Sequence, residues 1–275
     1  MSAGVTNDAV ADLPTGPVFY RDSGGDGVAV VLLHAASGNS LMWEHQIPAF
    51  MNAGYRVVAI DYRGVDGKPG PYDWSDQIDA LLVNLNIERF HLLGTAAGGG
   101  AAFQYVLAYP AKVRSLIVAN SHGNVTDRDY VEIGKRLRPS PQFDNLPVDF
   151  RELGPSYRAI NPDGVAQWLA LSARKPGVET DSGKAPTESI ALRAHGFALS
   201  AERTVTWAKL EALQVPTLLI TGDADLYTPA SILRMFLECM KAAEWAIIPE
   251  TGHSSYWESP ELFNATVLAF LRKHG

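Results

Sequence analysis

Short apolar runs recur along the chain, and each is followed by glycine, small or polar residues. Neighbouring positions within a run are all apolar and do not alternate with polar ones. This pattern is typical of strands that are covered on both faces, as in parallel sheets. The runs predict strands at residues 29–33, 56–60, 91–94, 116–119 and 217–221, and a last run of the same type lies at residues 245–248.

Segments with helical periodicity lie between these runs. Apolar residues three and four positions apart mark one helix face over residues 78–85 and another over residues 232–240. The C-terminal segment offers Ser259 as an N-cap, followed by Pro260 at the first helical position. Because strands and helices alternate, the sequence predicts an α/β fold with a mainly parallel central sheet flanked by helices.

One interval, from about residue 121 to residue 200, contains no strand-like run. It holds scattered prolines and isolated aromatic residues, and a structureless loop of that length is improbable within a compact domain. We therefore expect a small, largely helical insertion at residues 121–200. The core domain then consists of residues 1–120 and 201–275.

The composition excludes several classes of protein. The chain has 275 residues, a net charge of −7 and no block rich in lysine or arginine, so we expect no binding to nucleic acid. Its single cysteine, Cys239, excludes an intramolecular disulfide framework and an all-cysteine zinc site. Neither a membrane span nor the features of a signal peptide occur in the sequence. We expect a cytoplasmic protein that acts on a small molecule without a membrane partner. Whether it forms a homo-oligomer is left open by the sequence.

The segment HLLGTAAGGG, residues 91–100, carries the strongest local signal for chemistry. It runs from an apolar strand through a glycine-rich turn into an apolar helix, with Gly94 and Gly98 two residues on either side of Ala96. In a nucleophile elbow, glycines at these places allow a sharp turn that projects the central side chain. The central residue of such a turn is expected to be serine, whereas here it is alanine. The turn lacks the glycine spacing of a dinucleotide site and the lysine of a P-loop, which disfavours phosphate binding.

Two further signals follow later strands. Asp223 and Asp225 come directly after the strand at residues 217–221, and His253 lies between the last strand and the C-terminal helix. Taken singly, each aspartate is explained as a turn former or helix cap, and the histidine as an exposed loop residue. However, the carboxyl ends of parallel strands meet at one edge of a sheet, where ligands bind. The elbow, an acid and a histidine can therefore share one site.

The order of elbow, acid and histidine resembles that of the α/β-hydrolase superfamily, over nearly the whole chain. Residues 32–48 (LLHAASGNSLMWEHQIP) are similar to the strand-end segment of that family that supplies an oxyanion donor. Residues 60–70 (IDYRGVDGKPG) are similar to its D-x-R-G-x-G loop, and the insertion matches the position of its cap domain. The resemblance is greatest to capped esterases, enol-lactone hydrolases and meta-cleavage carbon–carbon hydrolases. It implies hydrolysis of a small carboxylic ester or lactone without a cofactor.

The resemblance also assigns roles to residues. Asp225 becomes the acid of a catalytic triad, and His253 becomes its general base. The backbone N–H groups of Ala36 and Ala97 become the oxyanion hole, although His-Ala-Ala replaces the common His-Gly start of the first segment. Asp223 is the weaker candidate for the acid. No carboxylate follows the strand at residues 116–119, where some relatives place an alternative acid, and this favours Asp225.

Four residues are candidates for contact with a substrate: Ser37, Trp43, Trp168 and Tyr256. Each also has a simpler interpretation. A loop hydroxyl often binds its own backbone, and an aromatic ring often serves ordinary packing. The aromatic residues of the insertion nevertheless suit an apolar roof over the sheet edge, as expected for a modest, partly hydrophobic substrate. The histidines are scattered without the spacing of metal ligands, so we expect no metal and no cofactor.

The alanine at position 96 restricts the mechanism, because a methyl group cannot attack a carbonyl. Three interpretations follow. In the first, the chain is a serine hydrolase made nearly inactive by a serine-to-alanine substitution. In the second, it is a natural enzyme in which His253 activates water or takes a substrate proton, carbon–carbon bond hydrolysis included. In the third, it binds a small molecule without catalysis. The surviving Asp225 and His253 and the intact glycines favour the first interpretation.

Overall fold

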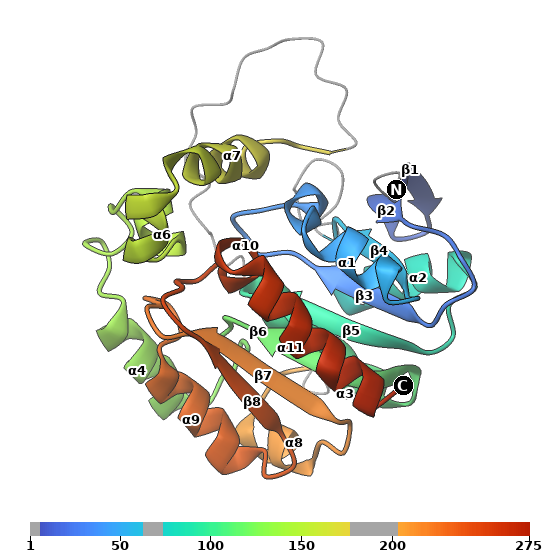
Figure 1. Cartoon of the computed structure of the whole chain (residues 1–275). Coiled ribbons are helices and arrows are strands. Elements are labelled where there is room, and N and C mark those ends of the chain that lie inside the picture. Colours follow the sequence, from blue (N-terminus) through green and yellow to red (C-terminus); the bar gives the residue numbers. More distant parts are fainter. Residues whose placement is uncertain (1–5, 63–73, 177–202) are drawn as a thin grey trace.

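A mostly parallel sheet of eight strands runs through the molecule, as the computed structural model shows for residues 6–62, 74–176 and 203–275 (Figure 1). The strand order is β1-β2-β4-β3-β5-β6-β7-β8. The strands are β1 (Asn7–Leu13), β2 (Gly16–Asp22), β3 (Ala29–Leu33), β4 (Arg56–Ile60), β5 (Phe90–Thr95), β6 (Val113–Ala119), β7 (Thr217–Gly222) and β8 (Glu244–Ile248). The strands from β3 to β8 all pair in parallel, which confirms the predicted α/β fold.

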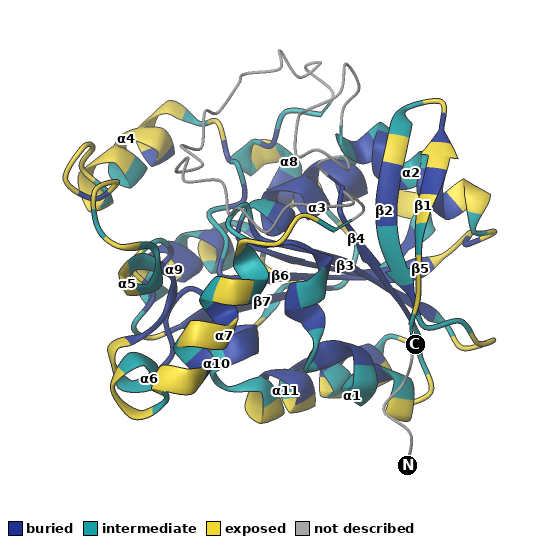
Figure 2. Cartoon of the chain, turned by 90° about the horizontal axis from the view of Figure 1, so that it is seen from above, coloured by how far each residue is buried: buried dark blue, intermediate teal, exposed yellow. Residues whose placement is uncertain are grey.

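Helices cover both faces of this sheet (Figure 2). One face carries α2 (Trp74–Asn84), α3 (Ala97–Ala108), α8 (Trp207–Ala212) and α9 (Ala230–Cys239). The other carries α1 (Gln46–Asn52) and α11 (Pro260–Lys273), with the short α10 (Ser255–Glu258) beside them. The connections also contain the 3-10 turns η1 (Ser40–Trp43) and η2 (Pro110–Lys112). No helix in these described segments is long and apolar enough to cross a membrane.

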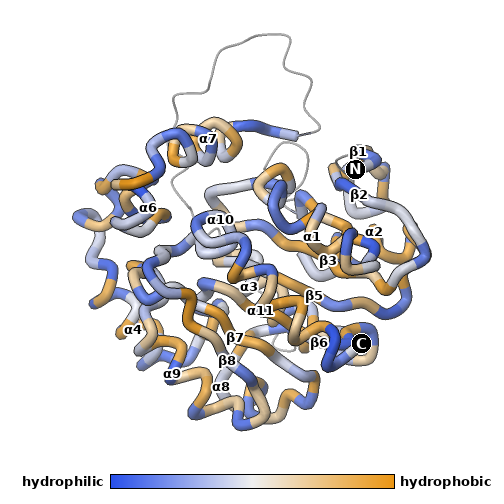
Figure 3. Tube along the Cα trace, in the orientation of Figure 1, coloured by the Kyte–Doolittle hydropathy of each residue, from blue (hydrophilic) through white to orange (hydrophobic). Residues whose placement is uncertain are grey.

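The continuous apolar strands are explained by this two-sided cover. In β3, Val31 and Leu33 pack into the core under α2, α3 and α9, whereas Val30 and Leu32 pack into the core under α1 and α11. The central strands are accordingly hydrophobic along their length (Figure 3). Strand β8 differs, because it is the edge strand. Trp245 is 56% exposed there, so the expectation that this run is also covered on both faces is wrong.

The antiparallel hairpin of β1 and β2 was not among the predicted strands. Its residues do not form a continuous apolar run: in β1, Ala11 and Leu13 are buried, whereas Asp8 and Asp12 are exposed. A strand with only one covered face shows this alternation. The pairing of β2 with β4, also antiparallel, attaches the hairpin to the parallel sheet.

The interval predicted as an insertion contains four helices among its described residues: α4 (Arg128–Leu137), α5 (Val148–Glu152), α6 (Pro155–Ile160) and α7 (Pro162–Ser172). Helices α6 and α7 lie above the carboxyl edge of the sheet (Figure 1). The side chain of Asn39 ties the end of α7 to the core, since its amide donates to the carbonyls of Leu171 (2.8 Å) and Arg174 (3.0 Å). Residues 177–202 lie outside the described residues, so the domain boundary at residue 200 stays a prediction.

Candidate active site

Ala96 occupies a strained turn between β5 and α3. Its φ is 51° and its ψ is −116°, a conformation that side-chain-bearing residues rarely adopt. Hydrogen bonds hold the turn from both sides: the Ala96 N–H donates to the Ala119 carbonyl (2.9 Å), and its own carbonyl accepts from the Gly99 N–H (3.1 Å). This is the backbone geometry of a nucleophile elbow, with a methyl group at the place of the nucleophile.

The two flanking glycines are required by close backbone contacts. A Cβ atom on Gly94 would lie 2.2 Å from the Gly98 carbonyl oxygen, and one on Gly98 would lie 2.2 Å from the Leu33 carbonyl oxygen. The start of α3 therefore lies directly against the end of β3. Ala97 is the first residue of α3, where a backbone N–H has no acceptor within the helix, and Ala36 follows β3 in the adjacent turn. The structure thus brings both predicted oxyanion donors to one edge, and their role stays a prediction.

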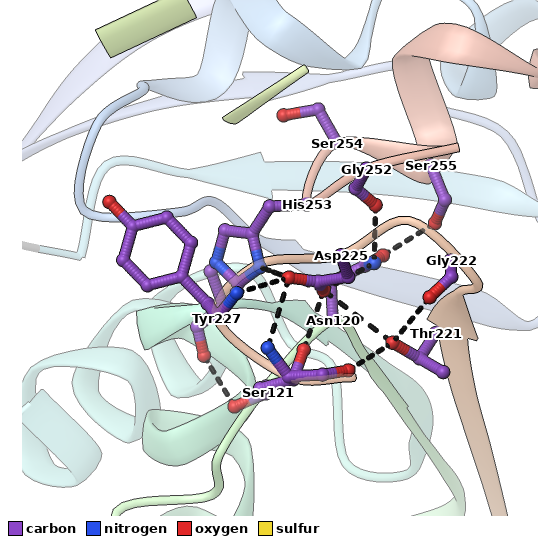
Figure 4. Close-up of polar contacts among 12 residues, drawn as sticks. Asn120, Ser121, Thr221, Gly222, Asp225, Tyr227, Gly252, His253, Ser254 and Ser255 are labelled. Atoms are coloured by element: carbon purple, nitrogen blue, oxygen red, sulfur yellow. Dashed lines mark hydrogen bonds and ion pairs between the residues drawn. The ribbon is translucent and has the colours of Figure 1, made fainter. Parts of the chain in front are cut away.

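His253 and Asp225 meet at the same edge (Figure 4). The Nδ1 atom of His253 lies 2.9 Å from Oδ2 and 3.0 Å from Oδ1 of Asp225. Both residues are buried, whereas Asp223 is exposed. Asp225 is therefore the partner of the histidine.

The Asp225 carboxylate is held by a dense set of hydrogen bonds. Its Oδ1 accepts from the N–H groups of Tyr227 (2.7 Å) and Thr228 (3.0 Å), and its Oδ2 accepts from the Thr228 hydroxyl (2.6 Å) and the Asn120 amide (3.0 Å). Burial alone would raise the pKa of Asp225, but the charge of His253 and these bonds outweigh it and hold the pKa well below its usual range. The carboxylate is therefore ionised.

The ionised carboxylate in turn raises the pKa of His253, against the lowering effect of burial. Because Nδ1 is hydrogen-bonded to Asp225, Nε2 is the ring atom that can exchange a proton with a substrate or nucleophile. The pair is thus suited to act as a general base, with Asp225 fixing the orientation of the ring.

Asn120 and Ser121 connect this pair to the elbow, and neither was predicted as a site residue. Asn120 is fully buried and also donates to the Gly252 carbonyl (3.1 Å), while the Ser121 hydroxyl donates to the Ala96 carbonyl. Both residues follow β6, the strand next to β5 in the sheet. Their position after a predicted strand is a usable signal, but an amide and a hydroxyl are not the carboxylate expected as the partner of the histidine.

Tyr227 packs against the histidine ring, with ring centroids 4.2 Å apart and planes inclined by 33° (Figure 4). Two residues between β6 and β7 also contact Tyr227: Arg138 donates a hydrogen bond to its carbonyl, and the Phe143 ring lies 4.9 Å from its ring. No sequence signal indicates this contact, because the residues are distant along the chain.

Glu258 fixes the backbone on both sides of His253. Its carboxylate accepts from the N–H groups of Gly252 (2.9 Å) and Ser254 (3.3 Å), and also from that of Gly154 (2.7 Å), beyond α5. Burial raises the pKa of Glu258 to about 7, opposed by these three backbone donors. The hydrogen bonds of Glu258 therefore connect the residues on both sides of His253 to each other and to the insertion.

The turn after β3 is held by Asp61. This buried carboxylate accepts from the N–H (3.0 Å) and the hydroxyl (2.7 Å) of Ser40, and it lies 3.3 Å from Nε2 of His34. Tyr62 donates to the His34 carbonyl (3.0 Å). His34 and Ser40 are thus engaged in holding the loop that carries Ala36.

The predicted substrate-contact residues gather where the insertion meets the core. The rings of Trp43 and Tyr256 lie 4.9 Å apart, and Trp168 from α7 belongs to the same apolar cluster. All three are at most 1% exposed. Ser37 is half-buried, and it acts to lower the pKa of Glu152, the last residue of α5. Their contact with a substrate stays a prediction.

Within the residues that the structure describes, no three histidine, cysteine, aspartate or glutamate side chains gather as metal ligands. The predicted absence of a metal and of a cofactor stays a prediction.

A doubly covered parallel sheet that presents an elbow, an acid and a histidine in this order at one edge defines the α/β-hydrolase class. The model of the alpha/beta hydrolase family matches residues 30–266, and the chain belongs to that family. A putative carbamate hydrolase, RutD, from Variovorax paradoxus is 28% identical over 94% of this chain and 97% of its own length. A 2-hydroxy-6-oxononadienedioate/2-hydroxy-6-oxononatrienedioate hydrolase from Burkholderia vietnamiensis is 25% identical over 93% of this chain and 91% of its own length.

Solved structures share the fold over almost the whole chain. An esterase from Thermogutta terrifontis superposes with a TM-score of 0.72 at 21% identity, covering 98% of this chain and 100% of its own. An enol-lactonase from Burkholderia xenovorans superposes with a TM-score of 0.70 at 16% identity, covering 96% of this chain and 100% of its own. At these identities the likeness shows the fold alone.

Proposed function

We propose that this edge is a site for hydrolysis of a small carboxylic ester or lactone, and that the alanine at position 96 leaves the chain able to bind its substrate but nearly unable to turn it over. One observation carries the proposal: a strained elbow lies on the same sheet edge as a buried, hydrogen-bonded His253–Asp225 pair. The names of the relatives and structural neighbours, which include hydrolases, an esterase and an enol-lactonase, support the substrate class.

With serine at position 96, the chemistry follows from the geometry. His253 Nε2 takes the hydroxyl proton while the serine oxygen adds to the substrate carbonyl, and the N–H groups of Ala36 and Ala97 stabilise the oxyanion. The tetrahedral intermediate then collapses, and His253 returns the proton to the departing alkoxide. Water, deprotonated by the same histidine, releases the acid from the acyl-enzyme. Asp225 stays ionised throughout and stabilises the imidazolium.

The test is a comparison of the chain with its Ala96→Ser variant on short-chain aryl esters and lactones. Loss of the nucleophile from such a triad costs about a millionfold in kcat, so the variant should gain several orders of magnitude and show an acyl burst. The double variant Ala96→Ser/His253→Ala serves as the control and should show neither. A variant that folds but gains no activity contradicts the proposal.

A second candidate function is a serine-less reaction in which His253 acts directly, as a base toward water or toward a substrate carbon acid, carbon–carbon bond hydrolysis included. The ordered His253–Asp225 pair favours it, because this base is complete without any side chain at position 96. Equal activity with and without Ala96→Ser, abolished by His253→Ala, supports this reaction. Measurable affinity for an ester with no turnover in either form supports a binding protein.

A further inference from the structure

Glu152 is a buried carboxyl group at this site for which the proposed chemistry has no use. It is the last residue of α5 and is 5% exposed. The two residues after it pack against the loop that carries the histidine: a Cβ atom on Gly252 would lie 2.5 Å from the Gly154 nitrogen and 2.8 Å from the Leu153 carbonyl carbon. The end of α5 is thereby fixed beside His253.

The surroundings of Glu152 come from several parts of the fold. Ser37 in the turn after β3 and the charge of His253 act to lower its pKa, and the Asp225 carboxylate acts to raise it. In its ionised form it would raise the pKa of the Tyr227 and Tyr256 phenols. The end of α5 thus brings Glu152 into the surroundings of the His253–Asp225 pair.

One oxygen of this carboxyl group, Oε2, is buried, and the residues that the structure describes offer it no hydrogen bond. Leaving a buried polar atom without a partner costs about 1–3 kcal/mol, so such atoms call for an explanation. A buried carboxyl oxygen that is left open beside His253 is placed to meet a ligand.

The charge state of Glu152 defines what it can bind. Burial raises its pKa, and the nearby Asp225 carboxylate adds to this effect, whereas His253, Ser37 and Arg151 act in the opposite direction. Because burial dominates, the pKa of Glu152 lies above its ordinary value, which favours the protonated acid, and this form can donate a hydrogen bond through its O–H.

We propose that Glu152 contacts the substrate and donates a hydrogen bond from its carboxyl group to an oxygen atom other than those of the scissile ester. The substrate class is then an oxygenated ester or lactone, with an ether, keto or hydroxyl group, in preference to a purely alkyl one. This proposal rests on the proposed function, since it assumes that esters occupy the same edge.

The experiment measures binding to the Ala96 chain itself, where slow turnover leaves the esters intact. Two matched pairs of probes differ by one oxygen function: phenyl methoxyacetate against phenyl butanoate, and phenyl 4-oxopentanoate against phenyl 4-methylpentanoate. One hydrogen bond contributes about 1 kcal/mol, so calorimetry should show at least one oxygenated ester bound about fivefold more tightly than its match. Glu152→Gln, which keeps a neutral donor, should retain this preference, and Glu152→Leu should abolish it.

The pH dependence gives a second measurement. Raising the pH ionises the carboxyl group and removes its donor, so the preference should fall with rising pH in the chain with Glu152. In Glu152→Gln the preference should be independent of pH. The groups that surround Glu152, namely His253, Asp225, Arg151, Tyr227 and Tyr256, are common to both forms, so their own titration cancels in the comparison.

Three results overturn the proposal. The first is an equal preference in the chain and in Glu152→Leu. The second is an equal loss of affinity for both members of each pair together with a lower melting temperature, because Glu152 would then only hold α5 in place. The third is no binding of any probe up to its solubility. These results do not depend on hydrolysis, so failure of Ala96→Ser to gain activity would reject the proposed function and still leave the Glu152 comparison decisive.

Discussion

The two halves of this site are built in different ways. The acid–base half is a set of side chains: Asp225 is bonded to His253, Asn120 and Thr228 and to backbone N–H groups. The elbow half is almost pure backbone, with a strained φ at Ala96 and glycines forced by close carbonyl contacts. Side-chain hydrogen bonds therefore orient the histidine, whereas steric constraints orient the side chain at position 96.

The largest expected effect comes from a substitution in the acid–base half of the site. In the Ala96→Ser background, Asp225→Asn should lower kcat by about four orders of magnitude, because the amide cannot stabilise the imidazolium or hold the required tautomer. Steady-state hydrolysis of an aryl acetate measures this loss. Asp223→Asn is the matched control: Asp223 is exposed two residues away, and its substitution should change kcat less than twofold. Similar losses in both variants would mean that Asp225 is not the partner of His253 in catalysis.

A smaller effect on stability tests the elbow half. Gly98→Ala places a Cβ atom 2.2 Å from the Leu33 carbonyl oxygen, so α3 must shift away from β3. We expect the free energy of unfolding to fall by about 3 kcal/mol, measured by urea denaturation. Gly24→Ala is the control, because no atom lies within 4 Å of the added Cβ there, although Gly24, unlike Gly98, has a positive φ. It should cost about 1 kcal/mol, and an equal cost at both positions would show that the contact with Leu33 does not constrain the elbow.

The same contrast explains how much of the molecule could be predicted from its sequence. Strands covered on both faces leave a continuous apolar run, so β3 and β4 were predicted with their observed bounds. The β1–β2 hairpin has one covered face and no such run, and it was missed. Glycines flanking a turn and the order of acid and histidine are local or linear signals, and the site residues predicted from them, Asp225 and His253, do meet.

The remaining site residues act through contacts between distant segments. Asn120 becomes a partner of Asp225 only because β6 lies beside β7 in the sheet. Glu152 belongs to a short helix of the insertion, where a glutamate is ordinarily exposed to solvent, and only the docking of α5 on the histidine loop buries it. No periodicity or spacing in the sequence contains that information, since burial of a polar residue depends on the packing of other elements against it.

The smallest expected effect concerns the strain at Ala96 itself. An alanine with φ of 51° and ψ of −116° stores about 1–3 kcal/mol, which glycine avoids. Glycine also adds about 0.5–1 kcal/mol of conformational entropy loss on folding, so Ala96→Gly should raise the free energy of unfolding by about 1 kcal/mol. Ala97→Gly, one residue on in regular helix, has no strain to release and should lower it. If urea denaturation shows both substitutions to be destabilising, the elbow is relaxed. If only Ala96→Gly is stabilising, the backbone at position 96 is strained although the alanine side chain cannot act as a nucleophile. Close backbone contacts alone then hold the elbow in this conformation.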